Sequence, residues 1–339
     1  MTWPGGWQSR ASPFPIWIEG SKLSPGRRTV VVAIGGNALS PSGESASVRN
    51  QFRHTRESLA SIVNLAREGW KIAIVHGNGP QVGDELLRNG VARNEVEQLP
   101  LGVLVAATAG WIGYMIQQSL QNALASTGSD RRVVTLITQS RVDPDDPAMS
   151  RPTKFIGRGL SDADATELRE DGVLIAQDPR GNLRRLVASP VPVEVIESDM
   201  VRELVLRGDI VIAAGGGGIP VYHDPVLGLE GVDAVVDKDR AAAILGRDIG
   251  ASVLLILTDV DGVYEDWGTD RARKVEELTS SQAQSLVAGG SLGAGSMRPK
   301  LEAAVHFLNS GGELAIIAAL EDGPAALAGK AGTTIRPGS

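Results

Sequence analysis

The stretch from Thr29 to Asn37 reads TVVVAIGGN, a continuous apolar run that ends in a glycine pair. A short apolar run closed by a turn signal is typical of a strand buried on both faces of a parallel sheet. The run at 71–75 has the same character and leads into the turn Gly77-Asn78-Gly79. Between the two runs, apolar residues recur at helical spacing until Gly69 ends the pattern. We therefore predict a strand, a helix and a second strand.

The rest of the chain continues this alternation. Parallel strands joined by helices place those helices on both faces of one sheet. The sequence thus predicts an α/β fold around a mostly parallel central sheet. Further strands are expected at 132–137, 209–213, 252–257 and 313–317, and further helices at 101–125, at 194–207 and from near Asp237 and Ser296.

Two segments interrupt the pattern. Residues 1–27 hold three Trp and four Pro with little periodicity, which indicates an irregular N-terminal tail before a folded domain of 28–339. Residues 140–189 are rich in Asp, Pro, Arg and Gly, with strand-like pieces at 173–176 and 183–187. We predict that this second segment is a small inserted lid subdomain.

The composition limits the classes of function. The 339 residues are 42% hydrophobic and carry a formal net charge of −7, which argues against a nucleic-acid binder. No run approaches a membrane span, so a soluble cytoplasmic protein is expected. The lack of cysteine excludes cysteine-ligated zinc, and the four scattered histidines disfavour a protein-held metal. Magnesium carried by a nucleotide is compatible with these counts.

Three glycine-rich turns directly follow predicted strands. One such turn alone is an ordinary tight turn, but glycines also let a phosphate approach the backbone closely. Because the carboxyl ends of parallel strands share one edge of the sheet, the three turns should converge on a single anion site. They are Gly35-Gly36-Asn37, Gly77-Asn78-Gly79 and the run Gly215, Gly216, Gly217 and Gly218.

Two lysines occupy the first turns of predicted helices. Lys238 directly precedes Asp239, and Lys300 follows Pro299. Helix starts favour acidic residues, so a lysine there works against the helix dipole unless an anion binds. A solvated surface lysine is the alternative for either residue alone. Together they predict contacts that neutralise a phosphoryl group in transfer, with Asp239 holding both ammonium groups.

The common nucleotide fingerprints are absent. No G-x-x-x-x-G-K-[ST] string occurs, and the nearest match to G-x-G-x-x-G has Val82 in place of its third glycine. An oxidoreductase is therefore the weaker interpretation. The stretch Thr258 to Tyr264, TDVDGVY, ends a strand and is expected to hold a nucleotide base and ribose. Its alternative is an ordinary Asp-Gly turn.

Nine strings along the chain resemble the carbamate kinases, which are members of the amino acid kinase superfamily. They occur in the family's order and span nearly everything from residue 30 onward, so the set is far more specific than any one string. They are AIGGNAL (33–39), HGNGPQVG (76–83), GWIGYMIQQSLQNAL (110–124), DPAMSRPTKFIG (146–157), RRLVASPVP (184–192), AAGGGGIPV (213–221), GVDAVVDKD (231–239), LTDVDGVY (257–264) and GSMRPKLEAA (295–304).

The resemblance implies a three-layer α/β/α sandwich that works as a homodimer. It also implies a reversible reaction, ATP plus carbamate giving ADP plus carbamoyl phosphate, used toward ATP synthesis in nitrogen catabolism. An N-lobe of 28–139 and 190–225 would hold the carbamate and phosphoryl site. The lid would be 140–189, and a C-lobe of 226–339 would bind the nucleotide.

By position, the resemblance assigns a role to each motif residue. Lys238 and Lys300 match phosphate-bridging lysines, Asp239 the aspartate that organises them, and Lys154 the lysine that the lid brings to the site. The loops around carbamate and the transferred phosphoryl are matched by Gly35, Gly36, Asn37, Gly77, Asn78 and Gly79, and the loop beside the substrate phosphate by Gly215, Gly216, Gly217 and Gly218. The contacts to ATP or ADP, which would bring Mg²⁺, are matched by Thr258, Asp259, Val260, Tyr264, Ser296 and Met297.

Two stretches depart from the family pattern. Around the lid lysine the family reads P-T-K-P-I-G-P, whereas this chain has Phe155 and Arg158 in place of the later prolines. The triplet Ala107-Thr108-Ala109 stands where the family reads M-S-Q. Two alternatives stay open. One is a kinase of the same superfamily for another small acid or for a larger acid, phosphate or phosphonate, and the longer substrate would need a cationic clamp such as Arg158. The other is a non-catalytic nucleotide-binding regulator.

Overall fold

The computed structural model describes residues 28–39, 47–178, 181–289, 292 and 297–338. The expected tail at 1–27 and Ser296 lie outside these residues, and the side chain of Asn37 is likewise outside the description. Among the described helices, none combines the length and the apolar character that crossing a bilayer requires.

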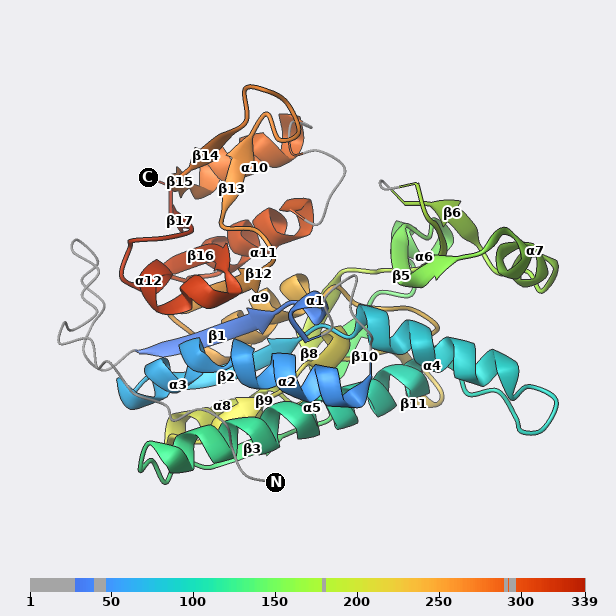
Figure 1. Cartoon of the computed structure of the whole chain (residues 1–339), viewed down its shortest axis with the longest axis horizontal. Helices are drawn as coiled ribbons and strands as arrows, with labels where there is room; N and C mark the ends of the chain where they lie inside the picture. The colour runs from blue at the N-terminus through green and yellow to red at the C-terminus, as the bar shows by residue number, and fades with distance from the viewer. Residues whose placement is uncertain (1–27, 40–46, 179–180, 290–291, 293–296, 339) are drawn as a thin grey trace.

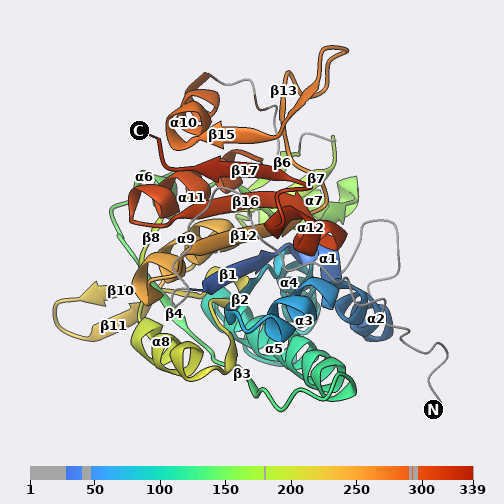
Figure 2. The same cartoon turned by 90° about the vertical axis from the view of Figure 1, so that its left-hand side faces the viewer.

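A central sheet of eight strands runs through the molecule, and helices cover both of its faces (Figures 1 and 2). Neighbouring strands are parallel except at one edge, where β17 is antiparallel to β16. The prediction of an α/β fold with a mostly parallel sheet is therefore confirmed. In spatial order the strands are β15 (Glu277–Thr279), β17 (Thr333–Arg336), β16 (Leu314–Ala319), β12 (Val253–Thr258), β1 (Thr29–Ile34), β2 (Lys71–His76), β9 (Ile210–Ile212) and β3 (Val133–Thr135).

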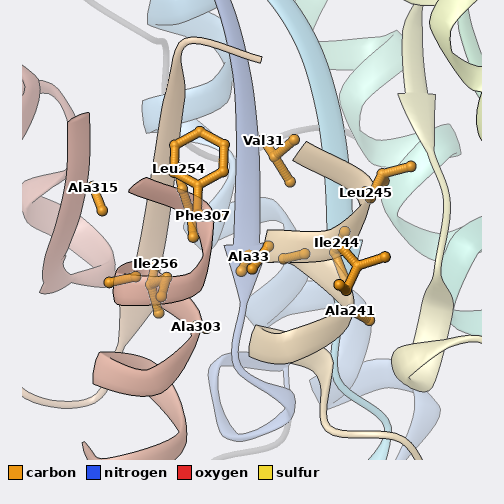
Figure 3. Packing of buried hydrophobic residues seen from close by; sticks show 14 of the residues in the cluster. Val31, Ala33, Ala241, Ile244, Leu245, Leu254, Ile256, Ala303, Phe307 and Ala315 are labelled. Atoms are coloured by element: carbon orange, nitrogen blue, oxygen red, sulfur yellow. The ribbon is translucent and has the colours of Figure 1, made fainter. Parts of the chain in front are cut away.

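Strand β1 lies in the middle of this sheet and is buried along its whole length. Because successive side chains of a strand point to opposite faces, Val31 and Ala33 join one hydrophobic cluster, whereas Val30 and Val32 join the other. Figure 3 shows part of the cluster that contains Val31 and Ala33, where side chains of the strands meet those of α9 and α11. The helices on that face are α8 (Ser198–Arg207), α9 (Lys238–Ile249), α10 (Ser280–Gly289) and α11 (Met297–Asn309), and those on the other are α2 (Val48–Ser58), α3 (Ala60–Arg67), α5 (Leu101–Ser126) and α12 (Gly323–Leu327).

The segment predicted as a lid, 140–189, forms a small sheet of its own. Its strands are β5 (Lys154–Leu160), β7 (Leu183–Val187) and β6 (Ile175–Gln177), accompanied by α6 (Pro147–Ser150) and α7 (Asp162–Glu170). In Figure 1 these elements project from the body beside α4 (Gly79–Val91). A Cβ on Gly83 of α4 would overlap the backbone of Gly157 in β5. The lid strand therefore rests on α4 by contact of backbone with backbone.

The remaining elements connect these parts. A four-stranded sheet contains β11 (Gly228–Gly231), β10 (Ile219–Asp224), β4 (Gln139–Val142) and β8 (Pro192–Val195), and β13 (Val263–Glu265) pairs with β14 (Arg273–Val275). Short helical turns are α1 (Gly36–Leu39), η1 (Gly215–Gly217) and η2 (Leu320–Asp322). Two of these turns, α1 and η1, follow sheet strands and carry predicted site glycines.

Candidate active site

The first two glycine-rich turns lie at the carboxyl ends of the neighbouring strands β1 and β2. They touch: Gly77 N donates to Ile34 O at 2.9 Å. A Cβ on Gly77 would lie 2.9 Å from Gly36 N and 3.1 Å from Lys238 Cδ. Such distances leave room only for glycine. The close approach therefore brings Lys238 beside two of the predicted loops.

The third glycine-rich turn follows β9, the other neighbour of β2. Gly216 and Gly217 have φ values of 67° and 94°, in the left-handed region that favours glycine. A Cβ on Gly216 would overlap the Asn78 amide, and one on Gly217 would overlap Val236 O. The structure thus brings the three loops together at one end of the sheet.

Asp239 joins the two predicted lysines. Lys238 Nζ donates to Asp239 Oδ1, and Lys300 Nζ lies 3.4 Å from Asp239 Oδ2. The side chains of Lys300 and Asp239 are 6% and 4% exposed, so both charges are held away from bulk water. Burial lowers the pKa of Lys238, and the charge of Asp239 opposes that shift. One carboxylate thus gathers two ammonium groups from the starts of α9 and α11.

The lid lysine reaches the same place through a different carboxylate. Lys154 Nζ is bound to Asp237 Oδ2, while Asp237 Oδ1 accepts from Asp239 N at 2.9 Å and caps α9. Burial alone would raise the pKa of Asp237, but the charge and hydrogen bond of Lys154, with the charges of Lys238 and Lys300, hold that pKa well below its usual value. Asp237 is therefore a charged link between the lid and α9.

Sequence reasoning did not select Asp237 as a site residue. An aspartate just before a helix has an ordinary interpretation as a capping residue, and Asp237 is one. Its second bond, to Lys154, joins residues 83 positions apart. The signal that could have found it is its place beside Lys238, as one of the two acids that flank this lysine.

Thr108 orients the side chain of Asn78. The Thr108 hydroxyl donates to the carbonyl oxygens of Leu104 and Val105, both at 2.9 Å, within α5. The oxygen of the same hydroxyl accepts from Asn78 Nδ2 at 2.9 Å. Both side chains are buried. The threonine therefore holds the Asn78 amide, which lies beside Gly216, with its NH2 group toward α5.

Replacing Thr108 with Val should lower kcat/KM of the phosphoryl transfer that the sequence predicts by about tenfold, equivalent to ~1.4 kcal/mol. Valine keeps the shape of the side chain but removes the acceptor, which leaves the buried Asn78 amide without that bond. Thr108→Ser keeps the hydroxyl and should stay within about twofold of the wild type. Equal kinetics for Val and Ser would show that Asn78 does not need this contact.

His76, the last residue of β2, lies under two of the loops. Its Nδ1 is 3.1 Å from the carbonyl oxygen of Gly77, and its Nε2 lies 2.6 Å from where a Cβ on Gly215 would stand. Burial lowers the pKa of His76 to about 4, so the ring is neutral at physiological pH. As pH falls through the usual histidine range, the unfolded chain gains a proton that the folded one does not, and stability declines.

The stretch predicted to hold the nucleotide begins at Thr258, the last residue of β12, which is the strand on the other side of β1. Thr258 is buried and donates from Oγ1 to Asp259 Oδ1 at 3.0 Å, whereas Asp259 and Val260 are more exposed. Met297 begins α11, one turn before Lys300. The predicted nucleotide residues and the lysines therefore lie along the same edge of the sheet.

Tyr264 is held in place by Asp261, which the sequence left as a possible turn residue. Tyr264 OH donates to Asp261 Oδ1, and Lys274 Nζ donates to Asp261 Oδ2, both at 2.9 Å. The hydrogen bond from Lys274 is the main reason that the pKa of Asp261 is lowered. The Tyr264 ring meets Trp267 edge-on, with 5.0 Å between centroids. These contacts form an aromatic and polar surface beyond β12.

The arrangement suits phosphate groups better than a metal held by protein alone. In the part of the chain that the structure describes, no group of three or more His, Asp or Glu side chains could hold a metal ion. Ammonium groups and glycine backbone in close contact are what phosphate oxygens require. The residues present therefore fit the phosphate groups of a nucleoside triphosphate.

Comparisons with known proteins cover nearly the whole described domain. The model of the amino acid kinase family matches residues 28–319. The carbamate kinase of Halobacterium salinarum is 45% identical over 309 residues, which are 91% of this chain and 98% of that protein. The carbamate kinase of Escherichia coli K12 is 42% identical over 316 residues, 91% of this chain and 99% of that protein.

Solved structures agree with the sequence comparisons. The carbamate kinase from Giardia lamblia bound to AMP-PNP matches with a TM-score of 0.84 and 35% identity, over 92% of this chain and 99% of that one. The same enzyme bound to citric acid matches with a TM-score of 0.87, at the same identity and coverage.

Proposed function

This chain belongs to the carbamate kinases of the amino acid kinase family, and from that membership we propose that its glycine loops and lysines transfer a phosphoryl group reversibly between ATP and carbamate. The observation that carries the proposal is that the ammonium groups of Lys238 and Lys300 both contact the carboxylate of Asp239. Phosphoryl transfer depends on neutralising the negative charge of the transferred group, and two ammonium groups held together can do so. Gly77 packs against Lys238 and places backbone amides beside that point.

The mechanism follows from these groups. In the forward direction a carbamate oxygen attacks the γ-phosphorus of ATP, the bond from that phosphorus to the β,γ-bridging oxygen breaks, and ADP leaves. The transition state spreads negative charge over the equatorial oxygens. Lys238 and Lys300 neutralise that charge, while amides of the glycine loops hold the oxygens. Transfer is in line, with no covalent enzyme intermediate, and Mg²⁺ is carried in by the nucleotide.

The lid lysine has a lesser part in this proposal. The Lys154 side chain is 33% exposed and pairs with Asp237, whereas Lys238 is 13% exposed and lies against Gly77. A more exposed charge acts through a higher effective dielectric. We therefore expect Lys154→Ala to lower kcat less than Lys238→Ala in steady-state assays at saturating substrates. The reverse ranking would make the lid lysine the principal cation.

The direct test of the reaction is ATP formation from ADP and carbamoyl phosphate in a coupled assay. Acetyl phosphate, which has a methyl group where carbamoyl phosphate has an amino group, is the matched control. The proposal requires strong activity with carbamoyl phosphate and weak activity with acetyl phosphate. Activity with acetyl phosphate alone would favour a related kinase for another small acid.

The lid substitutions give that alternative little support. The Phe155 ring packs with Arg184, whose guanidinium carbon lies 5.9 Å from the ring centroid. Arg158, the proposed cationic clamp, is exposed on the lid. Phe155 thus has a packing role within the lid. A non-catalytic regulator would not need Asp239 to keep two buried ammonium groups together.

We also propose that the enzyme is a cytoplasmic homodimer working toward ATP synthesis in nitrogen catabolism. Exposed apolar side chains support a second copy as partner: Val226 and Leu227, between β10 and β11, are 87% and 70% exposed, and Met200 and Leu206 project from α8. Light scattering at micromolar concentration tests the dimer. A monomer for the wild type would remove this part of the proposal.

A further inference from the structure

A second ion pair links the two helices that carry the lysines. Arg240 Nη2 of α9 lies 2.7 Å from Glu302 Oε2 of α11. Arg240 comes one residue after Asp239, and Glu302 two residues after Lys300. In this pair the base is on α9 and the acid on α11, the opposite of the Asp239–Lys300 contact. Two ion pairs therefore join the starts of α9 and α11, and the positively charged side chain is on α9 in one pair and on α11 in the other.

The apolar side chains near these starts include small ones. Figure 3 shows Ala241 on α9 and Ala303 on α11, and such small side chains make shallow ridges. The tight steric contact is farther along, where a Cβ on Gly246 would lie 2.8 Å from Phe307 Cε2. A helix advances about 1.5 Å per residue, so a change of one residue in register would displace Lys300 by that distance relative to Asp239, whose carboxylate lies 3.4 Å from its ammonium group.

We propose that Arg240 and Glu302 are positioning residues that fix the axial register of α9 against α11, and so the separation of the Lys238 and Lys300 ammonium groups. This inference rests on the proposed phosphoryl transfer, in which both ammonium groups act on one phosphoryl group. Arg240 and Glu302 are 27% and 29% exposed. Partly exposed pairs contribute little to stability, so their loss should affect turnover far more than folding.

The test compares single variants with a charge swap. Arg240→Gln and Glu302→Gln should each lower kcat for ATP formation from ADP and carbamoyl phosphate by about tenfold, with KM values within about twofold. The Tm should change by about 3 °C or less. The double variant R240E/E302R restores the pair with reversed charges and should return kcat to within about threefold of the wild type.

Arg247→Gln is the matched control. Arg247 is also on α9 and pairs with Asp248, but at the far end of the helix from the lysines. It should keep the wild-type kcat. Wild-type kcat in both single variants overturns the inference. So does a loss of kcat that tracks a loss of Tm and is not rescued by the swap. An inactive wild type would contradict the proposed function as well. An active wild type with unaffected variants would contradict this inference alone.

Discussion

Replacing Lys300 with Met should lower kcat for ATP formation by about two to three orders of magnitude. The variant removes one of the two charges that meet at Asp239, and in the proposed mechanism that charge is needed as the phosphoryl group separates. The fold should survive, because Met fills a similar volume and Asp239 keeps its bond to Lys238. Circular dichroism and thermal melting check the fold, and single-turnover kinetics check the chemical step.

Lys330→Met is the control for this experiment. Lys330 is an exposed lysine near the C-terminus, far in sequence from the site loops, so its loss should leave kcat unchanged. Near-normal turnover of the Lys300→Met enzyme would remove Lys300 from the mechanism. A collapse of the melting transition would instead show that Lys300 is needed for folding, and the milder Lys300→Arg variant would then test catalysis.

Replacing Asp239 with Asn should lower kcat at about pH 8 by about two orders of magnitude or more. Asn keeps the size of the side chain but removes the charge that holds both ammonium groups. In the wild type, burial lowers the pKa of Lys238 and Asp239 raises it in part. Without the carboxylate, that pKa falls further and Lys238 loses its proton more readily.

The direction of the pH effect distinguishes this explanation from a general loss of active-site structure in the variant. Because the active form of Lys238 is the charged one, the Asp239→Asn enzyme should regain activity relative to the wild type as pH falls from about 9 to 6. Asp199→Asn, which changes an exposed carboxylate on α8, should have the wild-type profile. A constant ratio of the two activities across this range would contradict a role for Asp239 in keeping Lys238 charged.

The glycine turns and the lysines could be recognised in the sequence because each has a local signal. An apolar run followed by glycines indicates a strand end, as at Gly35 and Gly77, and the order of strands in such a fold then brings the turns together. A lysine in a first helical turn is conspicuous, as at Lys238 and Lys300, because it opposes the helix dipole. These signals need only short windows of sequence.

Contacts between distant segments could not be predicted in this way. Asp237 pairs with Lys154, and Thr108 binds Asn78 across 30 positions, yet nothing in either local sequence specifies the partner. His76 reads as an ordinary strand end, and only its burial beneath Gly215 shows that its ring is neutral. The partner of a polar side chain depends on how the strands are ordered, which periodicity does not specify.

The contact of Gly83 with Gly157 leaves no space for a side chain between α4 and β5. Where two main chains already touch, a residue larger than glycine at position 83 would push the two elements apart. The spacing of β5 from α4 is therefore set by the backbone, and side chains elsewhere on β5, such as Phe155, can vary without changing that spacing.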